Sequence, residues 1–511
     1  MPILDQYGKA YKRSLSPGEQ EILRRQFARA KYDAAQTTLG NENHWINADN
    51  LSPNAAASYA VRQKLRARSR YEVIENNPYL KGTVLTIAND FVGGGPTLRI
   101  TDKRLSRERK RIIELRWRTY IKKIKLRQKL WRMRLAKIVD GEAFALAYIN
   151  DRIRHPVRLD YVVLEADQIS SENFLPIPSR EGVNEIDGIR FDNRFNPLEY
   201  HVLNNHPGGN VYTDVLGLRS DGQWIDEKFM IHWFRQDRGW LRGIPEMTPS
   251  LPLCSILRRY TLAILRHAET AADFSAVLET DGPAGTNAWT DGSGNLVQDD
   301  PFDSFPLEHG TIMNLPWGYK LKQLDAVPLG AQYDEFVGSM LREIIRPILV
   351  PFNIASGTSK DSNMATSIVD HHIYKGGQIS ERTTCNEDVL DQVLEGWWQL
   401  GIRTEDYFDD SVLGETDFLL ANPSLKGEPP QHEFGWDNIG LEHTDPSKVA
   451  AAIETLHQGR FLTDRDIQER YYNRDVEDWR EEVLEDDEFR EQLIPLDNGS
   501  QGSNSSNVTG E

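Results

Sequence analysis

The run Asp370-His371-His372 places three potential metal ligands side by side in the sequence. Carboxylate and imidazole groups bind divalent ions, and a metal-dependent phosphoesterase using these three residues is one possible function. The run lies inside a segment with helical spacing, where adjacent side chains point about 100° apart and do not chelate one ion together. The favoured interpretation is therefore a helix surface, and the phosphoesterase is kept as an alternative.

Other catalytic patterns are missing from the sequence. It contains no HExxH, no G-x-S-x-G, no GxxxxGK[ST], and only two cysteines, Cys254 and Cys385. The run Gly93-Gly94-Gly95 lacks the spacing of a dinucleotide fingerprint and follows a helix, which indicates a helix stop and a turn. We therefore predict no catalytic residue, no metal site and no cofactor, and the chain is not expected to be an enzyme.

A strongly basic stretch is the second region that could bind a ligand. Fifteen Lys and Arg lie between Lys103 and Arg134, with Trp117, Tyr120 and Trp131 among them. Aromatic and basic side chains together can hold single-stranded nucleic acid, so a soluble nucleic-acid-binding protein using residues 103–134 is a further alternative. The aromatic residues recur at helical intervals, however, which favours a solvated helix with one apolar face.

The charge of the chain is distributed unevenly along its length. The net charge of −17 divides into +16 for residues 1–150, −15 for residues 151–400 and −18 for residues 401–511. Such a split concerns partners and not the fold. A basic flank could grip an acidic partner or pair with the acidic flank of a neighbouring subunit, whereas the acidic remainder disfavours tight binding of nucleic acid over the whole surface.

Length and composition predict a multidomain globular protein. The chain has 511 residues and 58.5 kDa, with 39% apolar and 27% charged residues, which suits two to four domains. It has no apolar run of bilayer-spanning length and no signal-peptide pattern at its start, so no membrane association is expected. Two cysteines make no disulfide framework and suit a reducing interior.

The hydrophobic periodicity predicts the elements that must position these residues. Helices are expected over 16–36, 55–71, 79–90 and 106–139, with a break at Asn76-Asn77-Pro78 and a short strand at 98–100. After Asp140-Gly141-Glu142 the period becomes strand-like for about ninety residues. The expected elements that follow are a helix 249–273, an exposed insertion 281–303, paired strands 310–316 and 319–325, a helix 332–345, a polar loop 351–363, a helix 364–400, β-type runs 417–424 and 432–438, and helices 445–459, 463–471 and 475–493.

Several motifs, taken in order, resemble the lambda-type family of tailed-phage portal proteins. The similar segments are the Arg-rich run 62–70, Glu75-Asn76-Asn77-Pro78 with Gly82, Val92-Gly93-Gly94-Gly95, Asp140-Gly141-Glu142, His232-Trp233-Phe234-Arg235, Trp240-Leu241-Arg242-Gly243-Ile244-Pro245, Phe434-Gly435-Trp436, Asp445-Pro446 with Lys448, and the helix 450–459 with Leu462-Thr463. The resemblance covers about residues 20–490. Trp240 stands where the family usually has Gln, and the usual Trp-Val before Asp445 is missing.

The resemblance implies an α+β portal-type subunit with an α/β wing, two long stem helices, a β-containing clip and a helical crown. Carried over by order, the parts are N-terminal helices and wing 1–246, stem helix 247–273, clip 274–328, stem helix 329–350, tunnel loop 351–368, long helix and wing return 369–444, crown 445–493 and a disordered tail 494–511.

The resemblance also implies a function and partners. Such a protein forms a ring, expected to be a dodecamer, at the portal vertex of the virion capsid after assembly in the host cytoplasm. Double-stranded DNA passes through it without sequence specificity, and the ring meets the terminase large subunit, a head–tail adaptor, and capsid and scaffold proteins.

Two sets of site residues are expected on this basis. The loop facing DNA would contain Ser356, Gly357, Ser359, Lys360, Asp361 and Ser362, a mobile set with no strong net attraction for phosphate. The clip would present the exposed aromatic residues Trp289, Phe302 and Phe305 to its partners.

Overall fold

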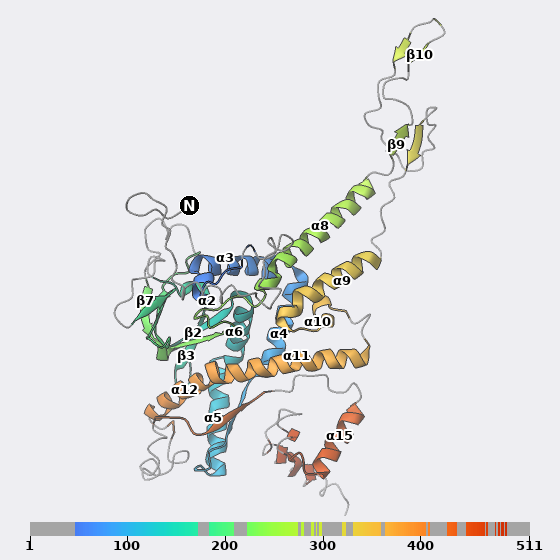
Figure 1. The fold of residues 1–511 in the computed structure, drawn as a ribbon. Helices are drawn as coiled ribbons and strands as arrows, with labels where there is room; N and C mark the ends of the chain where they lie inside the picture. The colour runs from blue at the N-terminus through green and yellow to red at the C-terminus, as the bar shows by residue number, and fades with distance from the viewer. Residues whose placement is uncertain are drawn as a thin grey trace, which may run out of the picture. The chain divides into compact units, whose positions relative to one another are not determined.

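The computed structural model (Figure 1) divides into two compact units, Met1–Ala56 and Ala57–Glu511. The structure describes residues 46, 48–171, 183–208, 222–273, 277–280, 288–290, 293, 296–298, 319–322, 331–358, 363–404, 407–408, 427–436, 446–464, 467–468, 476, 479–480, 482–484 and 486–487. The first unit contains the short helix α2 (Pro53–Ala56). The expected helix 16–36, the β-type run 417–424 and the tail 494–511 lie outside the described residues, as do most of the expected helices 463–471 and 475–493.

The first helical part of the second unit follows the predicted pattern. Helix α3 (Tyr59–Ser69) continues into a π-helical stretch, η2 (Arg70–Asn76), and helix α4 (Pro78–Val92) follows. Asn77 is extended, and its side-chain oxygen accepts hydrogen bonds from the backbone N–H groups of Tyr79 and Leu80 at 3.1 and 3.3 Å. Pro78 occupies the first turn, where its missing N–H costs little. The predicted break at this position is confirmed.

The basic stretch forms two helices and not the one helix that we expected over 106–139. Helix α5 (Arg107–Lys123) ends at Ile124, and helix α6 (Leu126–Asp140) begins after Lys125, whose φ of 54° lies in the left-handed region. Ile124 and Leu126 are both buried although they are only two residues apart. That spacing does not fit one face of a continuous helix, so the backbone breaks to bury both side chains.

The predicted β-rich block forms two antiparallel sheets. Strands β2 (Glu142–Ile149), β3 (Leu159–Leu164) and β8 (Met230–Phe234) form a three-stranded sheet in the order β3-β2-β8. Strands β4 (Asn184–Ile186), β5 (Ile189–Phe191), β6 (Pro197–Leu203) and β7 (Gly222–Asp226) form a four-stranded sheet in chain order. Single 3₁₀ turns, η3 (Ala166–Gln168) and η6 (Glu227–Phe229), precede β4 and β8.

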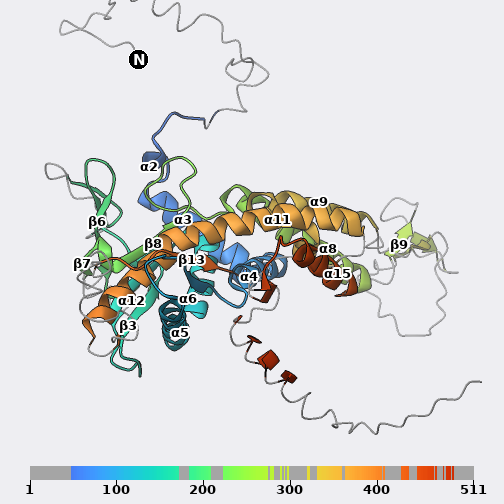
Figure 2. The ribbon, with the colours of Figure 1, turned by 90° about the horizontal axis from the view of Figure 1, so that it is seen from below.

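Two long helices follow the sheets and enclose the expected insertion. A 3₁₀ turn, η7 (Thr248–Ser250), leads into α8 (Leu251–Asp273), and the chain returns through α9 (Ala331–Ile345) and the turn η8 (Arg346–Ile348). Both views place strand β9 beyond the far end of α8 (Figures 1 and 2). The short strands between the two helices are β9 (Val277–Thr280), β10 (Ala288–Thr290), β11 (Leu296–Gln298) and β12 (Tyr319–Lys322).

The described strands of this insertion pair in two antiparallel pairs. Strand β12 pairs antiparallel with β9, and β10 pairs with β11. The expected pairing of residues 319–325 with 310–316 stays a prediction, because 310–316 lies outside the described residues. The pair β9–β12 brings the start and the end of the insertion together.

The C-terminal part is mainly helical. Helix α11 (Met364–Cys385), the π-helical stretch η9 (Asn386–Leu390) and helix α12 (Asp391–Arg403) form one continuous run, as predicted for 364–400. Strand β13 (His432–Gly435) pairs with β1 (Thr97–Ile100), and helix α15 (Pro446–Gln458) matches the expected helix 445–459. The fold class, a mixture of helices and small sheets, is confirmed. None of the described helices is long and apolar enough to cross a membrane.

Three apolar clusters form the core of the second unit. The first joins α5, α6, the three-stranded sheet and α12 around Trp117, Trp233 and Trp397. The second joins α4, α6, α8 and α9 around Leu80, Leu257 and Leu341. The third lies between the two sheets around Phe144 and Tyr200. Helix α6 contributes to the first two clusters and therefore links the sheet to the long helices.

Candidate functional site: a buried charge network at the start of the long helices

The loop expected to face DNA begins as a helix. Helix α10 (Phe352–Ser356) occupies the start of the segment 351–363, and Gly357 ends it with a φ of 67°. Asn353 Nδ2 lies 3.1 Å from His371 Nε2, and the Arg342 guanidinium lies over the Phe352 ring at 4.2 Å. Helix α10, which ends at Ser356 and Gly357, thus contacts both α9 and α11. Ser359, Lys360, Asp361 and Ser362 lie outside the described residues.

The residues expected to contact partners are described only in part. The backbone of Trp289 lies in β10, where it pairs with Val297 of β11, and its side chain is outside the described part. Phe302 and Phe305 also lie outside the described residues. All three side chains thus lie outside the described part, and their role stays a prediction.

The possible metal ligands Asp370, His371 and His372 lie on α11, as the helical spacing predicted. His371 is directed toward Asn353 of α10, and the side chains of Asp370 and His372 are exposed. Among the described residues no group of three His, Cys, Asp or Glu side chains could hold a metal ion. The arrangement gives the phosphoesterase alternative no support.

The aromatic residues of the basic stretch face the core and not the solvent. Trp117 and Tyr120 are buried, with ring centroids 5.3 and 6.0 Å from that of Trp397. The Trp131 indole N–H donates to the Asn89 side-chain oxygen at 2.8 Å. Trp117 and Tyr120 are therefore unavailable to stack on bases, which removes the main argument for the nucleic-acid-binding alternative.

The motif residues that are distant in sequence meet around one buried carboxylate. Glu142 is fully buried at the start of β2. Its oxygens accept hydrogen bonds from Arg242 Nε at 3.0 Å and Nη2 at 2.7 Å, and from the backbone N–H of Gly243 at 3.0 Å. Arg66 of α3 also pairs with Glu142, and His232 Nε2 of β8 lies 3.0 Å from it. Four separate motifs are joined in this way.

A second layer of carboxylates completes the network on the side of α3. Arg66 Nη1 lies 3.0 Å from Asp167, and Arg70 donates to Asp140 and Asp167 at 2.7 Å each. The Arg-rich run of the sequence thus has a structural role. Arg66 on α3 and Arg70 one turn later contact the turn at Asp140 and the 3₁₀ turn η3. These contacts fix α3 against the three-stranded sheet.

The buried charges shift the titration of their neighbours. Burial alone would raise the pKa of Glu142, but Arg242 and Arg66, with the hydrogen bond from His232, hold that pKa well below its usual range. Burial lowers the pKa of His232 and outweighs its contact with Glu142. The network is therefore a carboxylate between two guanidinium groups, with a neutral imidazole donating its Nε2–H to the carboxylate.

Two glycines allow the motifs to cross at close range. Gly141 has a φ of 89°, and a Cβ atom added there would collide with the backbone of Ile244. A Cβ atom added at Gly243 would collide with the carbonyl oxygen of Gly141. The turns 140–142 and 242–245 thus pack backbone against backbone, which explains a glycine in each.

The same junction extends to the long helices. Arg134 Nη1 of α6 donates to Glu246 at 2.8 Å, and Lys137 Nζ donates to Glu381 of α11 at 2.6 Å. The backbone N–H of Glu246 donates to the carbonyl of Ile138 at 3.1 Å. Because α8 begins only five residues after Glu246, these ion pairs fix the point from which α8 projects.

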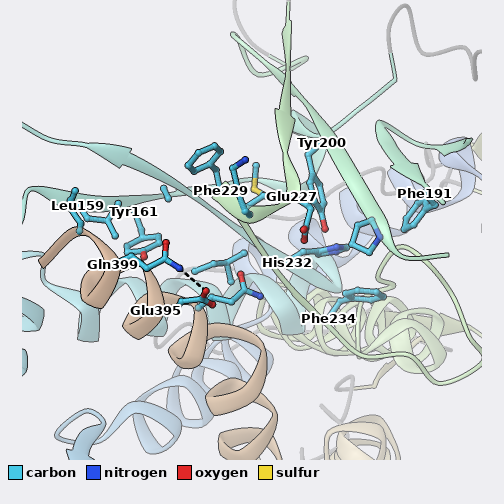
Figure 3. A pocket seen from close by; sticks show the side chains of 18 of the residues that line it. Leu159, Tyr161, Phe191, Tyr200, Glu227, Phe229, His232, Phe234, Glu395 and Gln399 are labelled. Carbon is cyan, nitrogen blue, oxygen red and sulfur yellow. Dashed lines mark hydrogen bonds between the residues drawn. The ribbon is translucent and has the colours of Figure 1, made fainter. Parts of the chain in front are cut away.

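A pocket of about 820 Å³ opens between the three-stranded sheet and α12 (Figure 3). Tyr161, Tyr200 and Phe234 line it from the strands, and Glu395 and Gln399 line it from α12, joined by a 2.9 Å hydrogen bond. His232 also lines the pocket, but its Nε2 is committed to Glu142. The lining residues form no nucleophile–base pair.

Sequence reasoning identified the motif residues but not what they do together. No local pattern shows that Arg66, Glu142, His232 and Arg242 share one site, because the contacts join positions 76 to 100 residues apart. The sequence did contain one usable sign, the charge of the motif residues. A buried arginine or glutamate is costly unless it is paired, so charged residues in motifs that enter the core must have partners of opposite charge.

The motif residues of this network lock separate structural elements together. The model of the family described as phage portal protein, lambda family, matches residues 40–367, more than half of the chain. The chain belongs to this family, and its function is that of a portal protein, the head–tail connector of a phage particle.

The similar solved structures are chains of gene transfer agent particles. Chains from the neck of an empty gene transfer agent particle computed with C6 symmetry and from the virion of a native gene transfer agent particle have TM-scores of 0.41 and 0.37. A chain from the native neck computed with C12 symmetry has a TM-score of 0.39. Each is 13% identical and covers 79% of this chain and 92% of its own. A search of curated proteins gave no match.

Proposed function

We propose that copies of this chain form a closed ring at one capsid vertex, through which double-stranded DNA is packaged and later ejected. The observation that carries the proposal is the family match over residues 40–367. The buried network supports the proposal, because its motif residues and the neighbouring ion pair Arg134–Glu246 fix the start of α8 relative to the sheets. A ring of identical subunits needs such rigidity, because small errors in each subunit accumulate around the circle.

The parts of the subunit are assigned by their order. Helices α8 and α9 belong to the stem segments 247–273 and 329–350, and the insertion 274–328 is the clip. The pairing of β9 with β12 supports this assignment, because it closes the base of the insertion and leaves its middle to extend outward. Residues 1–246 form the N-terminal helices and wing, 351–368 the tunnel loop, 369–444 the long helix and wing return, 445–493 the crown, and 494–511 the tail.

Passage of DNA requires a channel that does not hold it. Lys and Arg contacts with phosphates would add affinity and slow sliding, whereas residues 151–511 have a net charge of −33. The loop containing Ser356, Gly357 and residues 359–362 is the DNA-facing constriction in this proposal. The ring itself is not an enzyme; a separate terminase supplies the ATP-driven work, and the clip meets the terminase and then a head–tail adaptor.

The assembly is tested by native mass measurement and negative-stain imaging of the purified full chain. A single large species whose images show a central hole is expected. A chain that remains monomeric at every protein concentration and ionic strength would overturn the proposal. Salt should weaken the ring in part, because exposed ion pairs are screened while apolar contacts are not.

The loop assignment is tested by deleting residues 355–361. Rings should form normally, and particles should contain less DNA. The matched control is the double variant Asp370→Asn/His372→Gln on α11, whose side chains are exposed. Full genomes in particles of the deletion variant would contradict the assignment. The same control variant tests the phosphoesterase alternative. That alternative predicts metal-dependent hydrolysis of a phosphodiester by the wild type and its loss in the control variant.

The clip assignment is tested with the variant Trp289→Ala/Phe302→Ala. Ring assembly should be unchanged, while binding of terminase or adaptor should weaken roughly tenfold. Normal binding of both partners would place the contact elsewhere in the clip, for example on residues 311–324.

A further inference from the structure

Helices α8 and α9 pack against each other along one side only. The Tyr260 ring of α8 lies 6.2 Å from the Tyr333 ring and 4.5 Å from the Phe336 ring of α9. Leu257 of α8 and Leu341 of α9 are buried in the shared core. The opposite side of each helix faces away from this core, and each of these two outer faces has a distinct character.

The outer face of α8 is apolar and basic. Ile256, Arg259, Leu262 and Arg266 recur at helical spacing, and all four are exposed. Ile256 and Leu262 expose 51% and 45% of their surface. Arg258, the neighbour of Arg259, pairs with Glu72 of η2 within the chain. Arg259 itself has no partner among the residues that the structure describes.

The outer face of α9 is apolar and acidic. Glu335, Ser339 and Glu343 lie on it, and Phe336 stands at its edge, where its ring contacts Tyr260 of α8 and still exposes 41% of its surface. Within the described part of the chain, neither Glu335 nor Glu343 has an ion-pair partner. The two faces therefore differ in sign while both expose large apolar side chains. Exposed apolar side chains beside charges of opposite sign suit a contact between two protein surfaces.

The contact between Tyr260 and Phe336 also fixes the heights of the charges. It places Arg259 and Glu335 at about the same level along the helix pair, since each is the sequence neighbour of one ring. They do not pair within the chain. When copies of a chain are related by rotation about an axis, one surface of each copy meets a different surface of the next at a similar level.

We propose that, in the ring, the outer face of α8 binds the outer face of α9 of the adjacent copy, with Arg259 facing Glu335 and Glu343 and with Ile256, Leu262 and Phe336 buried between them. The partner is a second copy of this chain because one molecule presents both halves of a charge-matched contact that it does not make itself. The inference rests on the proposed ring and names the surfaces that close it. DNA is disfavoured as the occupant because its phosphates would be repelled by α9.

Charge reversal in two chains tests the inference directly. In a ring of Arg259→Glu chains, every α8–α9 contact places the introduced carboxylate opposite Glu335, and in a ring of Glu335→Arg chains every contact places two guanidinium groups opposite each other. Each variant alone should need a roughly tenfold or higher protein concentration to assemble. Mixing the two variants in equal amounts should restore rings, because alternating copies relieve the repulsion between like charges that each variant has alone.

The mixture separates a contact between copies from a contact within one. The double variant Arg259→Glu/Glu335→Arg should assemble in either case, because it restores opposite charges both within a chain and between copies. The mixture of single variants restores them only between copies. A double variant that assembles beside a mixture that does not would therefore overturn the inference. Rings that form normally from both single variants would overturn it as well. Matched controls are Arg118→Glu on α5 and Glu433→Arg on β13, both exposed side chains that should leave assembly unchanged.

Failure of this inference is distinguishable from failure of the proposed function. Wild-type chains that form rings while the charge variants also do so retain the portal ring and exclude this interface. Wild-type chains that form no ring reject the proposed function itself. Circular dichroism of each variant at low concentration confirms that the single chains are folded, so a loss of rings reports on association.

Discussion

The charges around Glu142 and the charges on the outer faces of α8 and α9 involve the same residue types in opposite circumstances. Glu142 is fully buried and is contacted by two arginines, a histidine and a backbone N–H. Arg259 and Glu335 are exposed and have no ion-pair partner among the described residues. The first group finds its ion-pair partners within one chain, and the second finds none among the described residues.

The difference shows which charges maintain the fold and which are available to a partner. A buried ion has lost its water, so removing its partner leaves an uncompensated charge at a high cost. An exposed ion keeps its water, so it costs the single chain little to remain unpaired. Burial, and not residue type, therefore separates the residues that fix the geometry of the subunit from those that can join subunits.

The largest expected effect comes from breaking the buried group. The variant Glu142→Gln removes the carboxylate that Arg242 contacts and one of the two carboxylates that Arg66 contacts, and it should lower the free energy of unfolding by about 3–5 kcal/mol. The measurement is denaturant unfolding at a protein concentration at which chains are single. The control Glu335→Gln should change that free energy by no more than about 0.5 kcal/mol. Equal effects of the two substitutions would refute the comparison.

The crossing of the two glycine turns should be nearly as sensitive. Gly141→Ala adds a Cβ atom at a φ of 89° and against the backbone of Ile244, so a loss of about 2–4 kcal/mol is expected. Gly239 is the matched control, because its φ is 71° but a Cβ atom there would meet open space. Gly239→Ala should therefore cost only the conformational part, about 1 kcal/mol. Comparable thermal melting of the two variants would show that the turns do not pack as described.

The sequence predicted local features of the fold better than distant contacts. Asn77 before Pro78 identified the start of α4, because capping and proline geometry act over a few residues. The break at Lys125 was missed, although the two-residue spacing of the buried Ile124 and Leu126 was a usable sign. The partners of Glu142 could not be predicted, because residues about 100 positions apart meet only after the sheet and α3 have packed.

The candidate site shows the same limit. The motifs led to the family, which the match over residues 40–367 confirmed. Their role in a charge network was not predicted, because a motif shows which residues recur together and not which of them touch. The outer faces of α8 and α9 became visible only when burial separated Leu257 and Leu341 from Arg259 and Glu335.

A smaller effect is expected from acidification of the buried group. The folded-state pKa of His232 is lowered, chiefly by burial, so the stability it contributes is complete above its unfolded pKa of about 6.5 and is lost as the pH falls below that value. Between pH 7.5 and 5.5 the wild type should lose more stability than His232→Gln does. The comparison uses denaturant midpoints at both pH values. Parallel losses in the two proteins would mean that the loss comes from other groups.

The smallest expected effect has the opposite sign and comes from an exposed helix position. Gly376 lies in α11, and a Cβ atom there would meet nothing within 4 Å. Gly376→Ala should raise the free energy of unfolding of single chains by about 0.5–1 kcal/mol, because alanine loses less backbone entropy in a helix. Gly396 of α12 provides the contrast, since a Cβ atom there would lie 2.9 Å from Leu159 Cδ2 and 3.0 Å from the Tyr161 hydroxyl. Gly396→Ala should therefore destabilise the same chain. Two glycines in the interior of neighbouring helices would then respond oppositely to one substitution, and a stabilising effect at both positions would show that α12 is less closely packed on β3 than the structure indicates.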